Sequence, residues 1–167
     1  YEFAKKLGHS IIDLKPSLVP IELNEKWLKE LMGLSLKNIS LSILKNNKTV
    51  YKEQGEMLFT SFGISGPLVL KGSRFIKNDS SYIALLDLKP ALETNELDKR
   101  IQKDFLKYKN NEFKSALNDL LPQKIIPLII KLSGIQEDKK VNVITKEERK
   151  NLVHIIKNIK MNIKGLR

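Results

Sequence analysis

The residue types best suited to chemistry gather in one stretch, Gly55–Pro67, which reads GEMLFTSFGISGP. Met57–Phe59 has the pattern of a short buried strand, and Gly63 and Gly66 punctuate the loop after it. Pro67 stands where a helix tolerates proline best, at its first position. A strand, a glycine loop and a helix start direct several backbone N–H groups, with the positive end of the helix dipole, at whatever lies in front of them. The stretch is therefore a candidate cradle for an anion or for the edge of a cofactor.

A structural interpretation of the same loop stays open. Ser65, Gly66 and Pro67 are also residues that would simply join a strand to a helix, and an isolated glycine loop is a weak indication of a ligand. No catalytic residue and no metal ligand is proposed. The candidate binding set is the loop itself, through its small and polar members: Thr60, Ser61, Gly63, Ser65, Gly66 and Pro67.

Cysteine is absent, which excludes disulfides, thiolate metal sites and thiol catalysis. The two histidines, His9 and His154, lie far apart without the spacing of a metal motif, so no metal site is expected. His154 also lies off the apolar stripe of its predicted helix, and a solvated histidine is the better interpretation there. Any redox chemistry would therefore belong to a bound cofactor. No apolar run approaches the roughly 20 residues of a membrane helix and no signal peptide is visible, so we expect a cytoplasmic protein with no membrane partner.

The formal net charge is +11, and a basic face is the electrostatic footprint of phosphate binding. The excess is uneven, with 12 basic and 9 acidic residues in 1–88 against 18 and 10 in 89–167. The second half is also rich in Asn and Ile, which share A/T-rich codons with Lys, and it lacks the interleaved aromatic residues of single-strand binders. We therefore do not expect nucleic acid as the partner, and a nucleic-acid- or ribosome-associated module stays an alternative.

Local periodicity predicts a first half rich in strands. In chain order the predicted elements are a helix tail at 1–7, a strand at 11–14 resuming at 18–19, a helix from Asn24 to Gly33, a hairpin at 36–53 turning at 45–48, a turn at 54–55, a strand at 56–60, a helix from 68 to about 76 whose connection ends at Ser80 and Ser81, and a strand at 82–88.

The second half changes to a helical period and then returns to a period of two. We expect helices at 94–108, 113–121, 124–132 and 145–157, the last opened by a Thr145–Glu148 capping box, and a closing strand at 159–163. A chain that is rich in strands at its start and returns to a strand at its end is best explained if the last strand pairs with the first ones. The predicted fold class is α+β, a small closed antiparallel barrel (1–88 completed by 158–167) with an inserted four-helix subdomain (89–157).

Three motifs in this order resemble the signatures of the BaiN-like flavoproteins, which are bacterial FAD-dependent NAD(P) oxidoreductases. They are Gly8–Ile11 continued by Leu14–Pro20, then Gly33–Asn38, then Gly55–Pro67. The resemblance is firm over 1–75, and over the helical part it rests on length and pattern. It implies an insert, made of a translation-protein-like barrel and a helix bundle, that interrupts a Rossmann-like FAD-binding domain.

The resemblance implies FAD in the parent protein, with NAD(P)H and an unknown acceptor, and the missing FAD-binding domain of the same chain as partner. The start at Tyr1 fits an excised piece. No G-x-G-x-x-G fingerprint occurs here, so we expect the isolated fragment to bind no FAD and to be inert. Ser61 departs from the family, which commonly has histidine or another polar residue after the threonine. A purely structural or dimerisation domain stays a further alternative.

Overall fold

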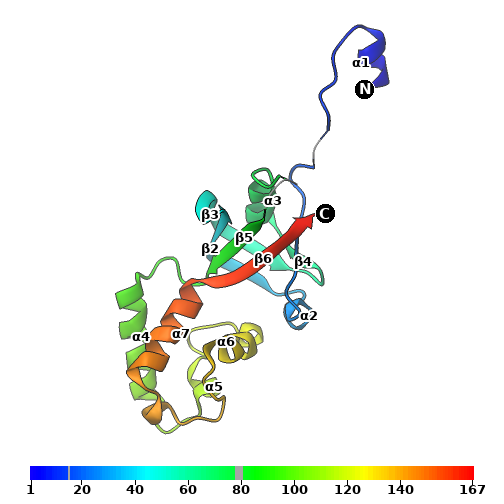
Figure 1. Ribbon diagram of the computed structural model, residues 1–167. Helices are drawn as coiled ribbons and strands as arrows, with labels where there is room; N and C mark the ends of the chain where they lie inside the picture. Colours follow the sequence, from blue (N-terminus) through cyan, green and yellow to red (C-terminus); the bar gives the residue numbers. More distant parts are fainter. Residues whose placement is uncertain (15, 78–80) are drawn as a thin grey trace.

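The structure is a computed structural model that describes residues 1–14, 16–77 and 81–167. Six antiparallel strands close into a barrel in the order β1-β4-β3-β2-β5-β6. A group of helices follows β5 and precedes β6, and it lies beside one end of the barrel (Figure 1). The predicted fold class, a closed antiparallel barrel with an inserted helical part, is therefore confirmed.

The central hairpin is formed by β2 (Ser35–Lys45) and β3 (Lys48–Phe59). Its turn lies where the sequence predicts it, at Asn46 and Asn47, whose φ angles of 49° and 62° are the left-handed values that a two-residue turn between antiparallel strands requires. Asn tolerates this region better than most residues, because its short polar side chain can hydrogen-bond locally.

The predicted turn at Gln54–Gly55 is wrong. β3 continues through both residues, with Gln54 opposite Ser40 and Gly55 opposite Ile39. The irregularity lies on the facing strand, where the register shifts between Leu36 and Ile39 and the intervening Asn38 has a φ of 55°. A bulge on one strand bends the pair locally, so the partner strand can continue without a turn.

The last strand closes the barrel, as the returning period predicts. β6 (Ile159–Leu166) pairs with β5 (Tyr82–Asp87) on one side and with β1 (Ile21–Leu23) on the other. β4 (Gly63–Ser65) completes the circuit between β1 and β3. Closure pairs both edges of the sheet and leaves no open edge for aggregation.

The segment before β1 differs from its prediction. The helix at the start is present as α1 (Glu2–Lys6), although it buries no residue and lies apart from the barrel in Figure 1. The strand predicted at 11–14 and 18–19 is absent, and Ile12 is 87% exposed. The first strand instead follows Pro20, because only there does an alternating pair of side chains reach the core between β4 and β6. Lys15, within the Leu14–Pro20 motif, lies outside the described residues. So does Ser80, where the connection after the helix predicted from residue 68 is expected to end.

The helix predicted from Asn24 to Gly33 is only α2 (Leu28–Leu31). Trp27 and not Asn24 stands at its N-cap position. The backbone N–H of Asn24 donates to Asn162 O at 3.0 Å and so extends the contact of β1 with β6. α3 (Pro67–Ser73) begins at Pro67, as predicted, with Gly66 before it at a φ of 99°.

The helical part follows its predicted order with shorter members. Thr145 and Glu148 form the predicted capping box of α7, and Glu93 and Glu96 form a second capping box at the start of α4. The bounds are α4 (Thr94–Lys107), α5 (Phe113–Ala116), η1 (Gln123–Ile125), α6 (Ile126–Ser133), η2 (Val141–Val143) and α7 (Lys146–Lys157).

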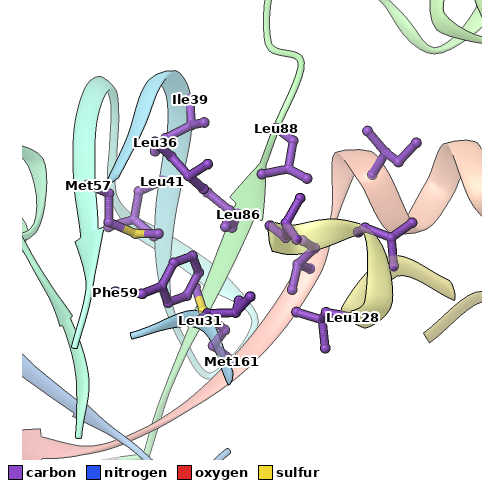
Figure 2. Close-up of a cluster of buried hydrophobic side chains, with 14 of the residues drawn as sticks. Leu31, Leu36, Ile39, Leu41, Met57, Phe59, Leu86, Leu88, Leu128 and Met161 are labelled. Carbon is purple, nitrogen blue, oxygen red and sulfur yellow. The ribbon is translucent and has the colours of Figure 1, made fainter. Parts of the chain in front are cut away.

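One hydrophobic cluster runs from the barrel into the helices. Figure 2 shows Leu31, Phe59 and Met161 together, with Leu86 on the side toward Leu128 of α6. Because both parts contribute to this core, the helices pack closely against the end of the barrel. Among the described residues, no helix has the length and apolar character needed to cross a membrane.

Candidate functional site

The predicted loop is a compact turn between β3 and α3. Thr60 N–H donates to Gly63 O at 2.9 Å, and Gly63 N–H donates to Thr60 Oγ1 at 3.1 Å. These two donors serve the turn and are not available to an anion. Ile64 and Ser65 then pair with the end of β3, so the region taken from sequence as an open glycine loop contains a strand.

Both loop glycines are explained by close backbone approaches. A Cβ on Gly63 would lie 2.0 Å from Ile21 O, and a Cβ on Gly66 would lie 3.3 Å from Met57 Cα. Gly66 also has a left-handed φ of 99°, which strains other residues. Barrel closure therefore requires these glycines whether or not the loop binds a ligand.

The exposed part of the loop lies where the chain enters and leaves the barrel. Ser61 and Pro67 are exposed, and Thr60, Phe62, Ser65 and Gly66 are half-buried. The Arg167 guanidinium lies 4.0 Å from the centre of the Phe62 ring, and Arg167 N–H donates to Pro20 O at 3.1 Å. Gly63 and Ile64 pair with Glu22 and Ile21, so the loop lies along β1, next to the point where the chain enters the barrel. Ligand contact by the six predicted site residues stays a prediction, as does the effect of Ser61 departing from the family pattern.

Apart from this loop, a cavity of about 310 Å³ lies between α4 and α7. It is lined by Thr94, Asn95, Asp98, Lys150 and Val153. Asp98 accepts a hydrogen bond from Arg149 Nε at 2.7 Å and from Gln102 Nε2 at 2.6 Å. The hydrogen bond from Arg149 holds the pKa of Asp98 below its usual range. Arg149 of α7 thus joins Asp98 of α4, and Gln102 of α4 occupies the second oxygen, so we interpret the group as a structural ion pair.

The Asp98–Arg149 pair predicts a dependence of stability on pH. Because the folded-state pKa is depressed, the stabilisation is present above the ordinary carboxyl pKa of 3.8 and is lost as pH falls through the folded value. We expect Asp98→Asn to cost about 1 kcal/mol of unfolding free energy at pH 7 and to lose less stability than the wild type on acidification. Urea unfolding at several pH values measures both effects. Glu2→Gln, on a helix that buries nothing, is the control, and parallel acid profiles for wild type and Asp98→Asn would contradict the prediction.

A third feature lies at the junction of the barrel and the helices. This cavity, of about 300 Å³, is lined by three groups of residues: Ser35, Leu36, Lys37 and Ile39 of β2, Leu88 and Lys89 after β5, and Leu121 and Pro122 before η1. Its charged lining residues are both lysines. Sequence analysis missed it, because the lining comes from segments far apart in the chain and carries no local motif.

Lys89 is the less exposed of these two lysines. Burial, and then the nearby charge of Arg100, lowers the pKa of Lys89. Its backbone N–H donates to Asp87 Oδ1 at 2.8 Å, whereas its ammonium makes no ion pair among the residues that the structure describes. Lys37 has only a weak partner, with 4.0 Å between its Nζ and Glu56 Oε1 and both side chains largely exposed.

The described residues do not fit FAD as its binding domain. Dinucleotides are held by a parallel βαβ unit whose first turn is rich in glycine. Here the strand pairs of the described residues are antiparallel, and the sequence has no G-x-G-x-x-G. Any flavin would therefore be held by other polypeptide segments.

Comparison with known proteins adds three relatives. The chain is 33% identical to "Ribosomal RNA dihydrouridine synthase" of Haemophilus influenzae, over 93% of this chain and 37% of the relative. It is 27% identical to the Escherichia coli protein with the same name, over 82% of this chain and 32% of the relative. It is 24% identical to "3-dehydro-bile acid delta(4,6)-reductase" of Clostridium scindens, over 83% of this chain and 34% of the relative. The chain thus spans about a third of the length of these relatives.

A family model described as "HI0933-like protein barrel and H2TH domain" matches residues 15–167, which include the whole barrel and all of the inserted helices. The chain therefore belongs to the HI0933-like barrel and H2TH domain family, a family of flavoprotein domains.

Proposed function

We propose that this chain is the insert domain of an FAD-dependent NAD(P) oxidoreductase that adds hydrogen to a carbon–carbon double bond conjugated to a carbonyl. The names of two of the relatives both describe this chemistry. A dihydrouridine is a uridine with two hydrogens added across the ring double bond next to a carbonyl, and a delta(4,6)-reductase of a 3-dehydro bile acid acts on double bonds conjugated to a ketone. The domain would cover the cleft in which such a substrate is reduced.

Ribosomal RNA is the substrate class that we favour. The observation that carries this choice is the 33% identity to a ribosomal RNA dihydrouridine synthase over 93% of the chain. The net charge of +11 supports it, because lysines and arginines that neutralise phosphates supply much of the affinity for nucleic acids. A bile acid carries a single carboxylate and would gain little from such a charge. The proposal thus departs from the sequence-based expectation that nucleic acid is not the partner.

The ends of the barrel strands support the role of an insert. β1 and β6 are neighbours, and the hydrogen bond from Arg167 N–H to Pro20 O holds the incoming and outgoing chain side by side. A host domain would then join the barrel through two adjacent connections. The loop at Thr60–Pro67 lies at this same end, so its exposed residues, Ser61 and Pro67, would face the host cleft. The division into 1–88 with 158–167 and an inserted 89–157 is part of this proposal.

The test uses the full-length protein with reduced nicotinamide cofactor and ribosomal RNA transcribed without modification. Nucleosides from the digested RNA are analysed by mass spectrometry, and dihydrouridine should increase with time in proportion to NADH or NADPH consumed. A 3-dehydro-delta(4,6) bile acid is offered in parallel. Reduction of the bile acid without dihydrouridine would replace the proposed substrate, and consumption of neither substrate would refute the proposed reaction class.

A further inference from the structure

The cavity at the junction of the barrel and the helices, lined by residues of β2, by Leu88 and Lys89 and by Leu121 and Pro122, is called the junction cavity here. We infer that this cavity, through Lys37 and Lys89, binds a backbone phosphate of the RNA. The inference rests on the proposed function for the identity of the ligand. The charge and shape of the cavity carry it.

The cavity is a positively charged space without a counter-charge in its lining. Its ionisable lining residues are Lys37 and Lys89, and Arg100 lies near enough for its charge to act on Lys89. Arg100 is itself engaged by Asp104, at 3.0 Å. A half-buried ammonium that has lost part of its water and lacks an ion pair gains more from a bound anion than a fully solvated one does.

The remaining lining residues favour contact with the sugar-phosphate backbone of RNA over recognition of a base. Apart from the hydroxyl of Ser35 and the two lysines, the side chains are aliphatic, namely Leu36, Ile39, Leu88, Leu121 and Pro122. Stacking on aromatic rings is how single-stranded bases are usually held, and the lining has no aromatic residue. A volume of about 300 Å³ is at the lower end of ligand pockets, which suits a phosphate with its sugar.

The cavity lies near the Thr60–Pro67 loop. Ser35 and Leu36 of its lining pair with Leu58 and Met57 of β3, and on the other side of β3 Leu58 pairs with Ser65. Neighbouring strands lie about 5 Å apart, so this edge of the cavity is roughly 10 Å from Ser65. A phosphate bound in the cavity would therefore lie close to a base held at the loop.

The test compares RNA binding by full-length variants. Lys37→Gln with Lys89→Gln removes both cavity charges, and Lys48→Gln with Lys52→Gln removes the same charge from exposed positions of the β2–β3 hairpin. We expect the dissociation constant for a ribosomal RNA fragment, measured by filter binding, to rise about ten-fold for each cavity lysine lost. The slope of log K against log salt should fall by about one per lysine, with the hairpin pair changing less on both measures.

Two further measurements keep the inference separate from folding and from the proposed function. Lys37→Glu changes an exposed side chain, so it should weaken RNA binding without disturbing the fold, and oxidation of reduced nicotinamide by a small dye should stay unchanged in every variant. RNA binding equal to wild type in the cavity variants, or no RNA binding by the wild type, would overturn the inference. Weakened binding in a protein that makes no dihydrouridine would sustain the site and refute the proposed substrate. Dihydrouridine formation by a protein whose cavity variants bind RNA as tightly as the wild type would support the proposed substrate and refute the cavity as a phosphate site.

Discussion

Gly63→Ala is expected to open the barrel at the contact of β4 with β1. The new Cβ would lie 2.0 Å from Ile21 O and 3.0 Å from Glu22 Cα, and both are backbone atoms that cannot rotate away. β1 has only 3 residues, so a shift of its backbone disturbs its pairing with β6 as well. We expect a loss of about 3 kcal/mol in unfolding free energy, at the upper end of the usual cost of overpacking.

Urea unfolding followed by tryptophan fluorescence measures this loss. The chain has a single tryptophan, Trp27, whose ring lies 6.0 Å from that of Phe59 at the end of β3, so its emission reports on the affected end of the barrel. The matched control is Gly165→Ala, opposite Glu22 on β6, where no atom lies within 4 Å of the new Cβ. The control should stay within about 0.5 kcal/mol of wild type. Equal midpoints for the two variants would show that Gly63 is not required by closure.

The second large effect is expected at Lys157, which joins the last turn of α7 to the end of β5. Its Nζ lies 2.7 Å from Asp87 Oδ2, 2.9 Å from Lys89 O and 2.7 Å from Leu92 O, and its side chain is 14% exposed. Lys157→Met keeps most of the stem but leaves a carboxylate and two carbonyls without their donor. We expect this variant to lose about 3 kcal/mol, because breaking a buried ion pair leaves the remaining charge uncompensated.

Lys160→Met is the control for Lys157, since Lys160 is an exposed lysine of the adjoining strand with no ion pair found in the described part of the chain. The control should change the unfolding free energy by less than about 0.5 kcal/mol. Adding Asp87→Asn to each variant gives a double-mutant cycle, in which a coupling energy of at least about 1 kcal/mol is expected between Lys157 and Asp87. A coupling near zero would mean that the two carbonyl contacts alone account for the role of Lys157.

These two positions also show how far sequence reasoning reached. The strand at 82–88, the helix opened by Thr145 and the closing strand after it were predicted because each carries its own period or cap within a few residues. The start of α3 at Pro67 was predicted for the same reason. The sequence marks Gly63 as part of a loop but does not predict its contact with Ile21, because no local pattern indicates which strand will approach a glycine.

The errors have the same origin. Apolar residues at 11–14 suggested a strand, yet a strand forms only where a partner edge is free, and β4 and β6 meet Ile21–Leu23 instead. Gln54–Gly55 suggested a turn, yet the bulge around Asn38 on the facing strand lets β3 continue. In both cases the pairing of distant segments decided the conformation of a short stretch with weak preferences of its own.

The sequence by itself determined the order of the elements, the absence of cysteine chemistry and the excess of positive charge, since these depend on composition and on neighbours a few residues apart. The tertiary structure alone decided which residues meet. It joined Gly63 to Ile21, seated Lys157 among three acceptors and lined the junction cavity with Lys37 and Lys89. These contacts depend on barrel closure, which brings together backbone segments that are far apart in the chain and whose side chains carry no mark of their future neighbours.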